Sequence, residues 1–286
     1  MRYLGMDGGG THLAVTLIDE KKKITDRFKI DTGVNLTSVD LKRLKSILED
    51  VHSKSQEVNG IVVSFSGAGT DKRKEVLRDI LINTFNTNNV IVYNDGESIL
   101  KFLFREKEIA LVIAGTGALV IGMNHDKNII RNGGWGHLFD DVGGGFWIST
   151  RIIQEAFKHR DGLREYDTIF EKLLKFYSVD KIEELTSLQL KEDFKTIISS
   201  FTKEALINPS DAVIEIIHDG LNDLSLRCKK ILKLLNIKQL YFTGSLFNSE
   251  YYLNEFKKFM HGYSLIRVDT DVSEKMAFLA KEYFAK

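Results

Sequence analysis

Hydrophobic residues in the first third of the chain fall into short apolar runs separated by stretches with helical spacing. The runs that predict buried strands are 3–6, 13–18, 24–30, 61–65 and 90–93. Between the third and fourth runs, apolar side chains recur every three or four residues and predict an amphipathic helix; they are Leu41, Leu44, Ile47, Leu48 and Val51. Further helices are expected over 76–84 and 97–104. The pattern predicts strands alternating with helices.

A second set of elements with the same layout begins at residue 109. Strands are expected at 109–114, 119–123 and 127–131, and the first two flank a glycine-threonine turn, as the first two runs of the chain also do. A repeated order of this kind is one sign of an internal duplication. The elements expected after it are a mostly helical region over 146–235, strands at 239–243 and 265–268, and helices at 249–260 and from 273. This alternation predicts an α/β fold in which helices cover mixed sheets.

Composition and charge exclude several classes of protein. Of 286 residues, 43% are hydrophobic and 28% are charged, which is the balance of a folded chain and not of a disordered one. Forty Lys and Arg balance forty Asp and Glu, so the basic excess of a nucleic-acid binder is missing. A single cysteine, Cys228, excludes an intrachain disulfide. With no apolar run of ~18 residues and no signal-peptide layout, we expect a cytoplasmic protein without membrane or nucleic-acid partners.

The 22 glycines are ordinary in number but unevenly placed, and 18 of them lie at or before Gly145. Two clusters follow expected strands, Asp7-Gly8-Gly9-Gly10-Thr11 and Ala114-Gly115-Thr116-Gly117-Ala118. Glycine lets successive N–H groups converge on an anion, and an aspartate beside such a loop can hold hydrated Mg²⁺. Each loop alone also fits a plain turn, whereas two in equivalent positions suggest a two-sided phosphate clamp. A P-loop is excluded, because no Gly-Lys pair occurs.

Two further segments carry candidate chemistry. Asn94-Asp95-Gly96 stands at the end of an expected strand and before a helix, so Asp95 is either a helix cap or a general base for phosphoryl transfer. Residues 133–145 contain six glycines together with Asp140 and Asp141. Aspartate on a loop shaped by glycines suits hydrogen bonding to a polyol.

These motifs resemble those of a known superfamily of ATPases that contains sugar kinases, heat-shock chaperones and actin. The loops at 7–11 and 115–117 are similar to its two phosphate motifs, and Thr243–Phe247 is similar to its adenosine motif. Residues 133–147 resemble the GGWG-x(4)-DEGS-x-x-W block of N-acetylglucosamine kinases and of the BadF/BadG/BcrA/BcrD ATPase group that contains them. The segments similar to the sugar-side motifs of that group are Thr32–Asn35 and Ser64–Gly67.

The resemblance implies two ribonuclease-H-like domains with mixed sheets flanked by helices, around a cleft that closes over the sugar. The implied domains are 1–107, completed by the C-terminal helix 273–286, and 108–272 with a helical insertion. ATP and Mg²⁺ are the implied cofactors, with Asp95 as general base and Asp7 near the metal. The implied nucleotide-binding residues are Asp7, Gly9, Gly10, Thr11, Gly115, Thr116, Gly117, Gly244 and Ser245. The implied sugar-binding residues are Asn35, Ser66, Asn94, Asp95, Gly134, Trp135 and Asp141.

Several positions depart from the family pattern. His12 and Leu13 stand where Lys or Arg and then a hydroxyl residue are usual, which weakens one phosphate contact. Val142 and Gly144 replace the usual glutamate and serine, and Ala118 replaces a common serine. The carboxylate lost at Val142 changes which hydroxyl or N-acetyl group is bound, so the identity of the sugar stays open.

The leading interpretation is an ATP-dependent carbohydrate kinase that phosphorylates a primary hydroxyl of N-acetylglucosamine, glucosamine or glucose. The first alternative is a kinase of a sugar acid such as 2-keto-3-deoxygluconate, which would favour a cationic partner such as Arg131 or Arg151. The second is a non-catalytic ATP-binding switch. An iron–sulfur dehydratase activator is disfavoured, because those relatives carry two cysteines per chain. The expected partners are a small sugar or sugar acid and, since relatives are often dimers, a second copy of the chain.

Overall fold

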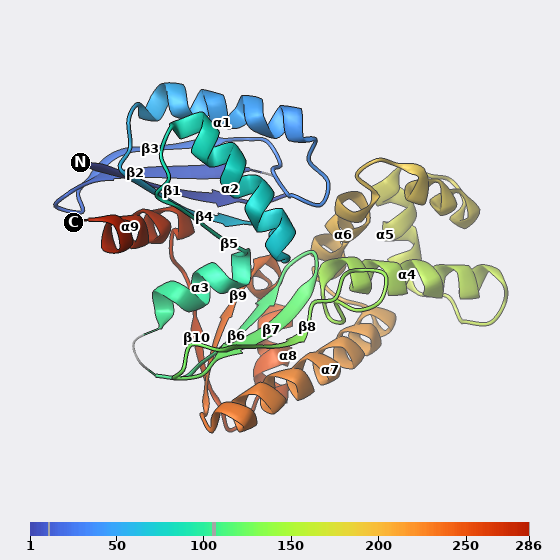
Figure 1. Ribbon diagram of the computed structural model, residues 1–286. Helices are drawn as coiled ribbons and strands as arrows, with labels where there is room; N and C mark the ends of the chain where they lie inside the picture. Colours follow the sequence, from blue (N-terminus) through green and yellow to red (C-terminus); the bar gives the residue numbers. More distant parts are fainter. Residues whose placement is uncertain (11, 105–106, 286) are drawn as a thin grey trace. The chain divides into compact units, whose positions relative to one another are not determined.

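The computed structural model describes residues 1–10, 12–104 and 107–285 (Figure 1). The chain divides into two compact units, and each is described by itself. Unit 1 comprises Met1–Arg105 and Asp269–Lys286, and unit 2 comprises Glu106–Val268. That these units correspond to two actin-like domains with boundaries at 107/108 and 272/273 stays a prediction.

Unit 1 contains a mixed five-stranded sheet in the order β3-β2-β1-β4-β5. Its strands are β1 (Arg2–Gly8), β2 (Leu13–Asp19), β3 (Ile24–Ile30), β4 (Gly60–Phe65) and β5 (Val90–Tyr93). The first three pair antiparallel, whereas β1, β4 and β5 run parallel. Its helices are α1 (Leu41–Ser55), α2 (Asp71–Phe85), α3 (Asp95–Leu103) and α9 (Val272–Phe284). All the strands expected in this part of the sequence are present.

Both faces of this sheet are covered by helices. Leu4 and Met6 of β1 belong to a buried cluster that also contains the apolar stripes of α1 and α2. On β1 itself, α9 packs against Gly5, where an added Cβ would lie 2.0 Å from the carbonyl oxygen of Ser273. Only a residue without a side chain permits such an approach. The C-terminal helix is therefore part of the core of unit 1.

One helix of unit 1 begins earlier than its apolar spacing predicts. α2 starts at Asp71 and not near Val76, because Thr70 is its N-cap and accepts a hydrogen bond from the Arg73 N–H at 3.4 Å. The first turn of α2 is polar and exposed, so hydrophobic periodicity does not reveal it.

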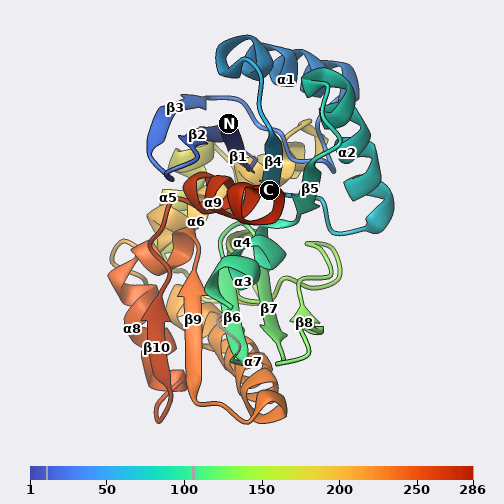
Figure 2. The same ribbon diagram turned by 60° about the vertical axis from the view of Figure 1, so that its left-hand side comes forward.

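Unit 2 repeats the strand order of unit 1, β10-β9-β6-β7-β8 (Figure 2). Its strands are β6 (Ile109–Ala114), β7 (Ala118–Met123), β8 (Ile129–Gly133), β9 (Gln239–Thr243) and β10 (Ser264–Arg267). Three consecutive strands again pair antiparallel, and β6, β9 and β10 run parallel, as β1, β4 and β5 do in unit 1. The shared order supports an internal duplication.

Helices form the rest of unit 2. They are α4 (Gly145–Arg160), α5 (Thr168–Tyr177), α6 (Phe194–Ala205), α7 (Asp211–Leu235) and α8 (Glu250–Phe259), with 3-10 helices at Ile182–Leu190 and Ser245–Asn248. The long α7 packs along β6, β7 and β8. Its buried stripe includes Val213, Ile217, Leu221, Leu224, Cys228 and Ile231, as its spacing predicts.

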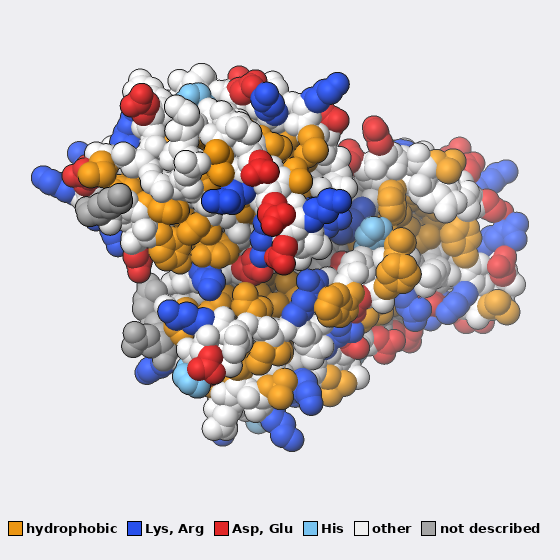
Figure 3. Space-filling view, in the orientation of Figure 1, with side chains coloured by type: hydrophobic (Ala, Val, Ile, Leu, Met, Phe, Trp, Pro, Cys, Tyr) orange, Lys and Arg blue, Asp and Glu red, His pale blue; other side chains and the backbone are white. Residues whose placement is uncertain are grey.

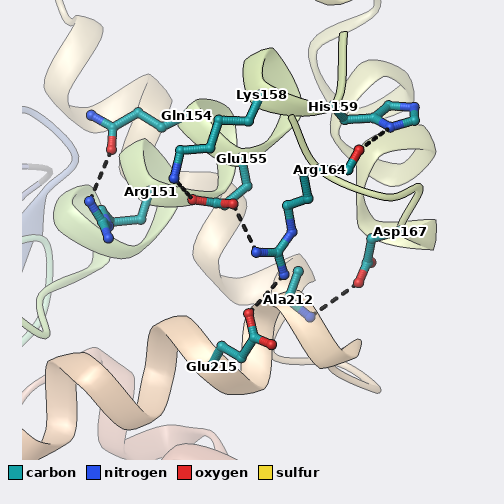
Figure 4. Close-up of polar contacts among 9 residues, drawn as sticks. All are labelled: Arg151, Gln154, Glu155, Lys158, His159, Arg164, Asp167, Ala212 and Glu215. Atoms are coloured by element: carbon teal, nitrogen blue, oxygen red, sulfur yellow. Dashed lines mark hydrogen bonds and ion pairs between the residues drawn. The ribbon is translucent and has the colours of Figure 1, made fainter. Parts of the chain in front are cut away.

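An ion-pair cluster around one buried carboxylate links helices of this region (Figure 4). The side chain of Glu155 on α4 is 8% exposed and lies 2.7 Å from the Lys158 ammonium and 2.9 Å from the Arg164 guanidinium. Arg164 also pairs with Glu215 on α7 at 2.8 Å. Burial raises the pKa of Glu155, but the hydrogen bond and charge of Lys158 and the charge of Arg164 outweigh it, so the net shift is downward. The cluster fixes α4 against α7.

The surface is mixed in character. On the face drawn in Figure 3, basic and acidic side chains are interspersed, in keeping with the balanced net charge of the sequence. Among the residues that the structure describes, no helix is both long enough and apolar enough to span a bilayer.

Candidate active site

Three polar segments of unit 1 meet at one edge of its sheet. β1, β4 and β5 are parallel, so their carboxyl ends lie side by side, where α/β sheets commonly bind ligands. Asp7 is paired in register with Ser64, and Ser64 with Tyr93, two residues before Asp95. The topology thus brings together Asp7, Ser64 and Asp95, which are far apart in the sequence.

The surroundings of Asp7 disfavour the ionised form of its carboxyl group. It is mostly buried, and burial raises its pKa to about 6, helped by the nearby carboxylates of Asp95 and Asp271 and opposed by a hydrogen bond from Ser64. Within the described residues it has no Lys or Arg ion-pair partner. A carboxylate that lacks a cation and is surrounded by negative charge fits a divalent metal ion, and Mg²⁺ is often held by one such group plus water and phosphate oxygens.

Asp95 is the first residue of α3, but it is not the cap of that helix. The Asn94 Oδ1 atom accepts from the Glu97 N–H at 2.9 Å, and a Glu97 carboxylate oxygen accepts from the Asn94 N–H at 3.2 Å. This capping box assigns the cap to Asn94, so the interpretation of Asp95 as the cap is wrong. The Asp95 side chain is exposed, and its Oδ2 accepts a hydrogen bond from the Ser66 hydroxyl at 3.1 Å.

The two sugar-side segments pack against each other in the same unit. The Leu36 N–H donates to the Ser66 carbonyl at 3.0 Å, and the Ser66 N–H donates to the Gly8 carbonyl at 2.8 Å. Gly67 has φ +84°, and a Cβ there would lie 2.5 Å from the Asn35 Oδ1. That oxygen accepts from the Thr37 N–H and hydroxyl at 2.9 and 2.8 Å, so it holds the local turn. The Asn35 amide nitrogen is the part of this side chain suited to a ligand.

The first glycine loop follows β1. The Gly9 N–H donates to the His12 carbonyl at 3.0 Å, and the Gly9 carbonyl accepts from the Val34 N–H at 2.9 Å. Gly10 has open space where a side chain would stand, and Thr11 lies outside the described residues. Leu13, one of the departures from the family pattern, is fully buried as the first residue of β2 and belongs to the core of unit 1.

In unit 2, the second glycine loop and the adenosine-type motif follow the neighbouring parallel strands β6 and β9. Gly244 has φ +114°, and a Cβ there would lie 2.2 Å from the Ala114 carbonyl oxygen, so glycine is required. Within the described residues, the N–H groups of Thr116 and Gly117 donate to no protein acceptor. Two such donors on adjacent residues suit an anion.

The Gly143–Gly145 segment packs directly on this loop. The N–H groups of Gly145 and Phe146 donate to the carbonyls of Gly115 and Thr116 at 2.8 and 2.9 Å. A Cβ on Gly144 would lie 2.6 Å from the Gly117 carbonyl carbon. In this chain, Gly144 therefore replaces the usual serine at a position where a side chain would clash with the second glycine loop.

Asp141 lies against the same loop. It is buried with φ 60°, and a Cβ on Gly117 would lie 2.5 Å from its Oδ2. Burial raises its pKa, and the charge of Lys195 opposes the shift. The Asp141 carboxylate, expected to bind sugar, thus borders the loop expected to bind phosphate.

The neighbouring Asp140 was not among the expected site residues, and it anchors the loop. Its buried carboxylate accepts from the Trp135 N–H at 3.1 Å and pairs with Arg227 of α7 at 2.9 Å. Arg227 also pairs with Asp223. No motif marks Arg227, which lies in a helix far along the chain, so only the tertiary structure reveals this contact.

A pocket of about 480 Å³ lies beside Ser245, within the size range of ligand sites. Its lining residues are Lys203, Leu206, Ile207, Ser245, Leu246, Asn248, Ser249, Glu250 and Tyr251. Ser245 was expected to contact nucleotide. The first three come from the end of α6 and just beyond it, in a region where the sequence shows no motif.

Two mixed sheets of ribonuclease-H-like order, with a glycine loop after the first strand of each, define an actin-like ATPase fold. A family model for the BadF/BadG/BcrA/BcrD ATPases matches residues 4–273. The chain therefore belongs to the BadF/BadG/BcrA/BcrD ATPase family.

Similar proteins are named as sugar kinases. The N-acetylmuramic acid/N-acetylglucosamine kinase of Clostridium acetobutylicum is 28% identical over 91% of this chain and 91% of its own length. The N-acetyl-D-glucosamine kinase of Dictyostelium discoideum is 24% identical over 65% of this chain and 63% of its own. A crystal structure from Porphyromonas gingivalis, described as a candidate N-acetylglucosamine kinase, has a TM-score of 0.80 at 18% identity over 98% of this chain and 99% of that one. These findings confirm the expected family, fold and enzyme class, an ATP-dependent carbohydrate kinase.

Proposed function

We propose that this protein transfers the γ-phosphoryl group of ATP to a primary hydroxyl of N-acetylglucosamine or a closely related amino sugar. The observation that carries the proposal is the placement of Asp95. Its carboxylate is exposed at the start of α3, where Asn94 is the cap, and it accepts hydrogen bonds from the Ser66 hydroxyl and the Gly96 N–H. The names of the curated relatives support the choice of sugar.

In the proposed reaction, Asp95 is the general base. Its Oδ2 accepts the proton of the sugar hydroxyl as that oxygen forms a bond to the γ-phosphorus, while the bond from phosphorus to the oxygen of ADP breaks. The Ser66 hydroxyl, 3.1 Å from Oδ2, holds the carboxylate in one orientation. Positioning and proton acceptance are the main contributions a kinase makes to phosphoryl transfer.

The remaining parts of the site bind the nucleotide. Asp7 would hold Mg²⁺, which neutralises charge on the phosphates when bound. The N–H groups of Thr116 and Gly117 would donate to phosphate oxygens, and the pocket beside Ser245 would take the nucleoside. On the sugar side, the proposed contacts are Asn35, Ser66, Gly134, Trp135 and Asp141.

A sugar panel tests the proposal. The protein is incubated with ATP and Mg²⁺, and ADP release is followed with N-acetylglucosamine, glucosamine, glucose and 2-keto-3-deoxygluconate. We expect the largest increase with N-acetylglucosamine. If only the sugar acid raises ADP release, the alternative acceptor is correct, and if no sugar raises it, the kinase proposal fails.

Replacement of the base gives a second test. Asp95→Asn is expected to lower kcat by about 10²–10⁴-fold, because the neutral amide cannot accept the hydroxyl proton. Asp79→Asn is the matched control, since Asp79 is an exposed carboxylate on α2 of the same unit. An unchanged kcat in Asp95→Asn would remove Asp95 from the role.

A further inference from the structure

Arg131, on the outer strand β8 of the unit 2 sheet, has a side chain fixed by the loop that follows it. Its Nε donates to the Gly133 carbonyl at 2.9 Å, and its Nη2 donates to the Gly134 carbonyl. Its guanidinium carbon lies 4.5 Å from the ring centroid of Trp135. Both carbonyls and the indole belong to the segment proposed to bind sugar, so the positive charge is held at that segment.

In the part of the chain that the structure describes, this charge has no protein counterion. No Asp or Glu oxygen pairs with Arg131 within the described residues, whereas Arg227, which also lies near this loop, pairs with Asp140 and Asp223. A guanidinium carries five N–H donors, and the two carbonyls use two of them. Three donors remain, in the planar arrangement that matches a carboxylate.

The indole ring beside this charge is exposed and can also contact a ligand. Trp135 is 66% exposed, although its backbone N–H donates a hydrogen bond to the Asp140 Oδ2 atom at 3.1 Å. A tryptophan with a fixed backbone and an exposed ring offers an apolar surface next to the cation. Such a pair suits a ligand group that combines an anionic end with a short apolar portion.

We infer that Arg131 and Trp135 form a subsite for an anionic substituent carried by the sugar, an inference that rests on the proposed function. The substituent that fits is a carboxylate on a short ether arm, as in the lactyl group of N-acetylmuramic acid. The protein then phosphorylates both this acidic sugar and neutral N-acetylglucosamine, and Arg131 determines its efficiency with the acidic one.

The test compares the two sugars in four proteins, namely the wild type, Arg131→Gln, Arg131→Lys and Arg151→Gln. Arg151 is the matched control, because its guanidinium also lies near a tryptophan, 5.8 Å from the Trp147 ring, but on α4, where it donates to Gln154 (Figure 4). We expect Arg131→Gln to lower kcat/KM for N-acetylmuramic acid by about 10-fold or more, mostly through KM, since a charged hydrogen bond is lost. The value for N-acetylglucosamine should fall by a clearly smaller factor, because that sugar has no carboxylate and is affected only through the loop that Arg131 holds.

The other variants separate charge from loop structure. Arg131→Lys should recover part of the efficiency with the acidic sugar, Arg151→Gln should change neither sugar, and the KM for ATP should be unaltered in all four proteins. Equal losses with both sugars would show that Arg131 only holds the loop and would overturn the inference. A wild type active on N-acetylglucosamine alone would also overturn it while leaving the proposed function standing. Activity on neither sugar would overturn the inference, and if glucosamine also failed to raise ADP release it would refute the proposed function itself.

Discussion

Replacing Arg227 by methionine removes the cation that neutralises Asp140, a buried carboxylate within the proposed sugar loop. Asp140 is 8% exposed, and it would keep one hydrogen bond, from the Trp135 N–H. Breaking a buried ion pair by removing one partner costs about 3–5 kcal/mol, because the remaining charge is left uncompensated. The Arg227 side chain is 21% exposed, so water screens the pair in part and the lower end applies. We expect Arg227→Met to reduce the free energy of unfolding by about 3 kcal/mol.

A double-mutant cycle separates the charge from the lost packing. Asp140→Asn in the Arg227→Met background removes the uncompensated charge, so the double variant should be more stable than Arg227→Met alone, with a coupling energy of about 1.5 kcal/mol or more. Urea unfolding gives each value, and the KM for the sugar should rise in Arg227→Met because the loop has lost an anchor.

Arg160→Met is the matched control for this cycle. Arg160 also pairs with two carboxylates, Asp161 and Glu183, but its side chain is 50% exposed. Pairs between exposed charges contribute little to stability, so this variant should lose much less stability than Arg227→Met. If Arg227→Met costs no more than Arg160→Met, or the coupling is near zero, Asp140 is not the buried partner that the structure indicates.

Two further predictions concern the phosphate loops. The pKa of Asp7 is raised, so its ionised form destabilises the ligand-free fold; the penalty is absent below about pH 4 and complete above about pH 6. Asp7→Asn should therefore stabilise the ligand-free protein by roughly 2–3 kcal/mol at pH 8 and not at pH 4, as measured by thermal unfolding without Mg²⁺. The same variant should bind Mg²⁺-ATP more weakly. Equal effects on stability at both pH values would contradict the raised pKa of Asp7. Gly144→Ser, which restores the usual family residue, should lower the free energy of unfolding by about 1–3 kcal/mol, because its Cβ would stand 2.6 Å from the Gly117 carbonyl carbon. It should also raise the KM for ATP. Unchanged urea unfolding and unchanged kinetics would show that the two loops can move apart without loss.

The sequence predicted most elements because strands and helices leave local periodic patterns. All ten strands within the described residues lie where apolar runs were expected, and the buried stripe of α7 follows from its spacing alone. The glycine loops were also predictable, since only glycine tolerates the positive φ and the close backbone approach seen at Gly244. These clusters were sufficient to identify the family, which the match over residues 4–273 confirms.

Other features depend on contacts between distant parts of the chain, which leave no local pattern. The sequence left open whether Asp95 is a helix cap or a general base, and the capping box of Asn94 and Glu97 assigns the cap to Asn94. The anchoring of Asp140 by Arg227 and the contribution of Lys203 to the pocket beside Ser245 come from helices without motifs. Arg131 and Arg151 are equivalent in the sequence as candidate cations for a sugar acid. Only the tertiary structure distinguishes them, because the carbonyls and the indole that hold Arg131 belong to the proposed sugar loop, whereas Arg151 stands on α4.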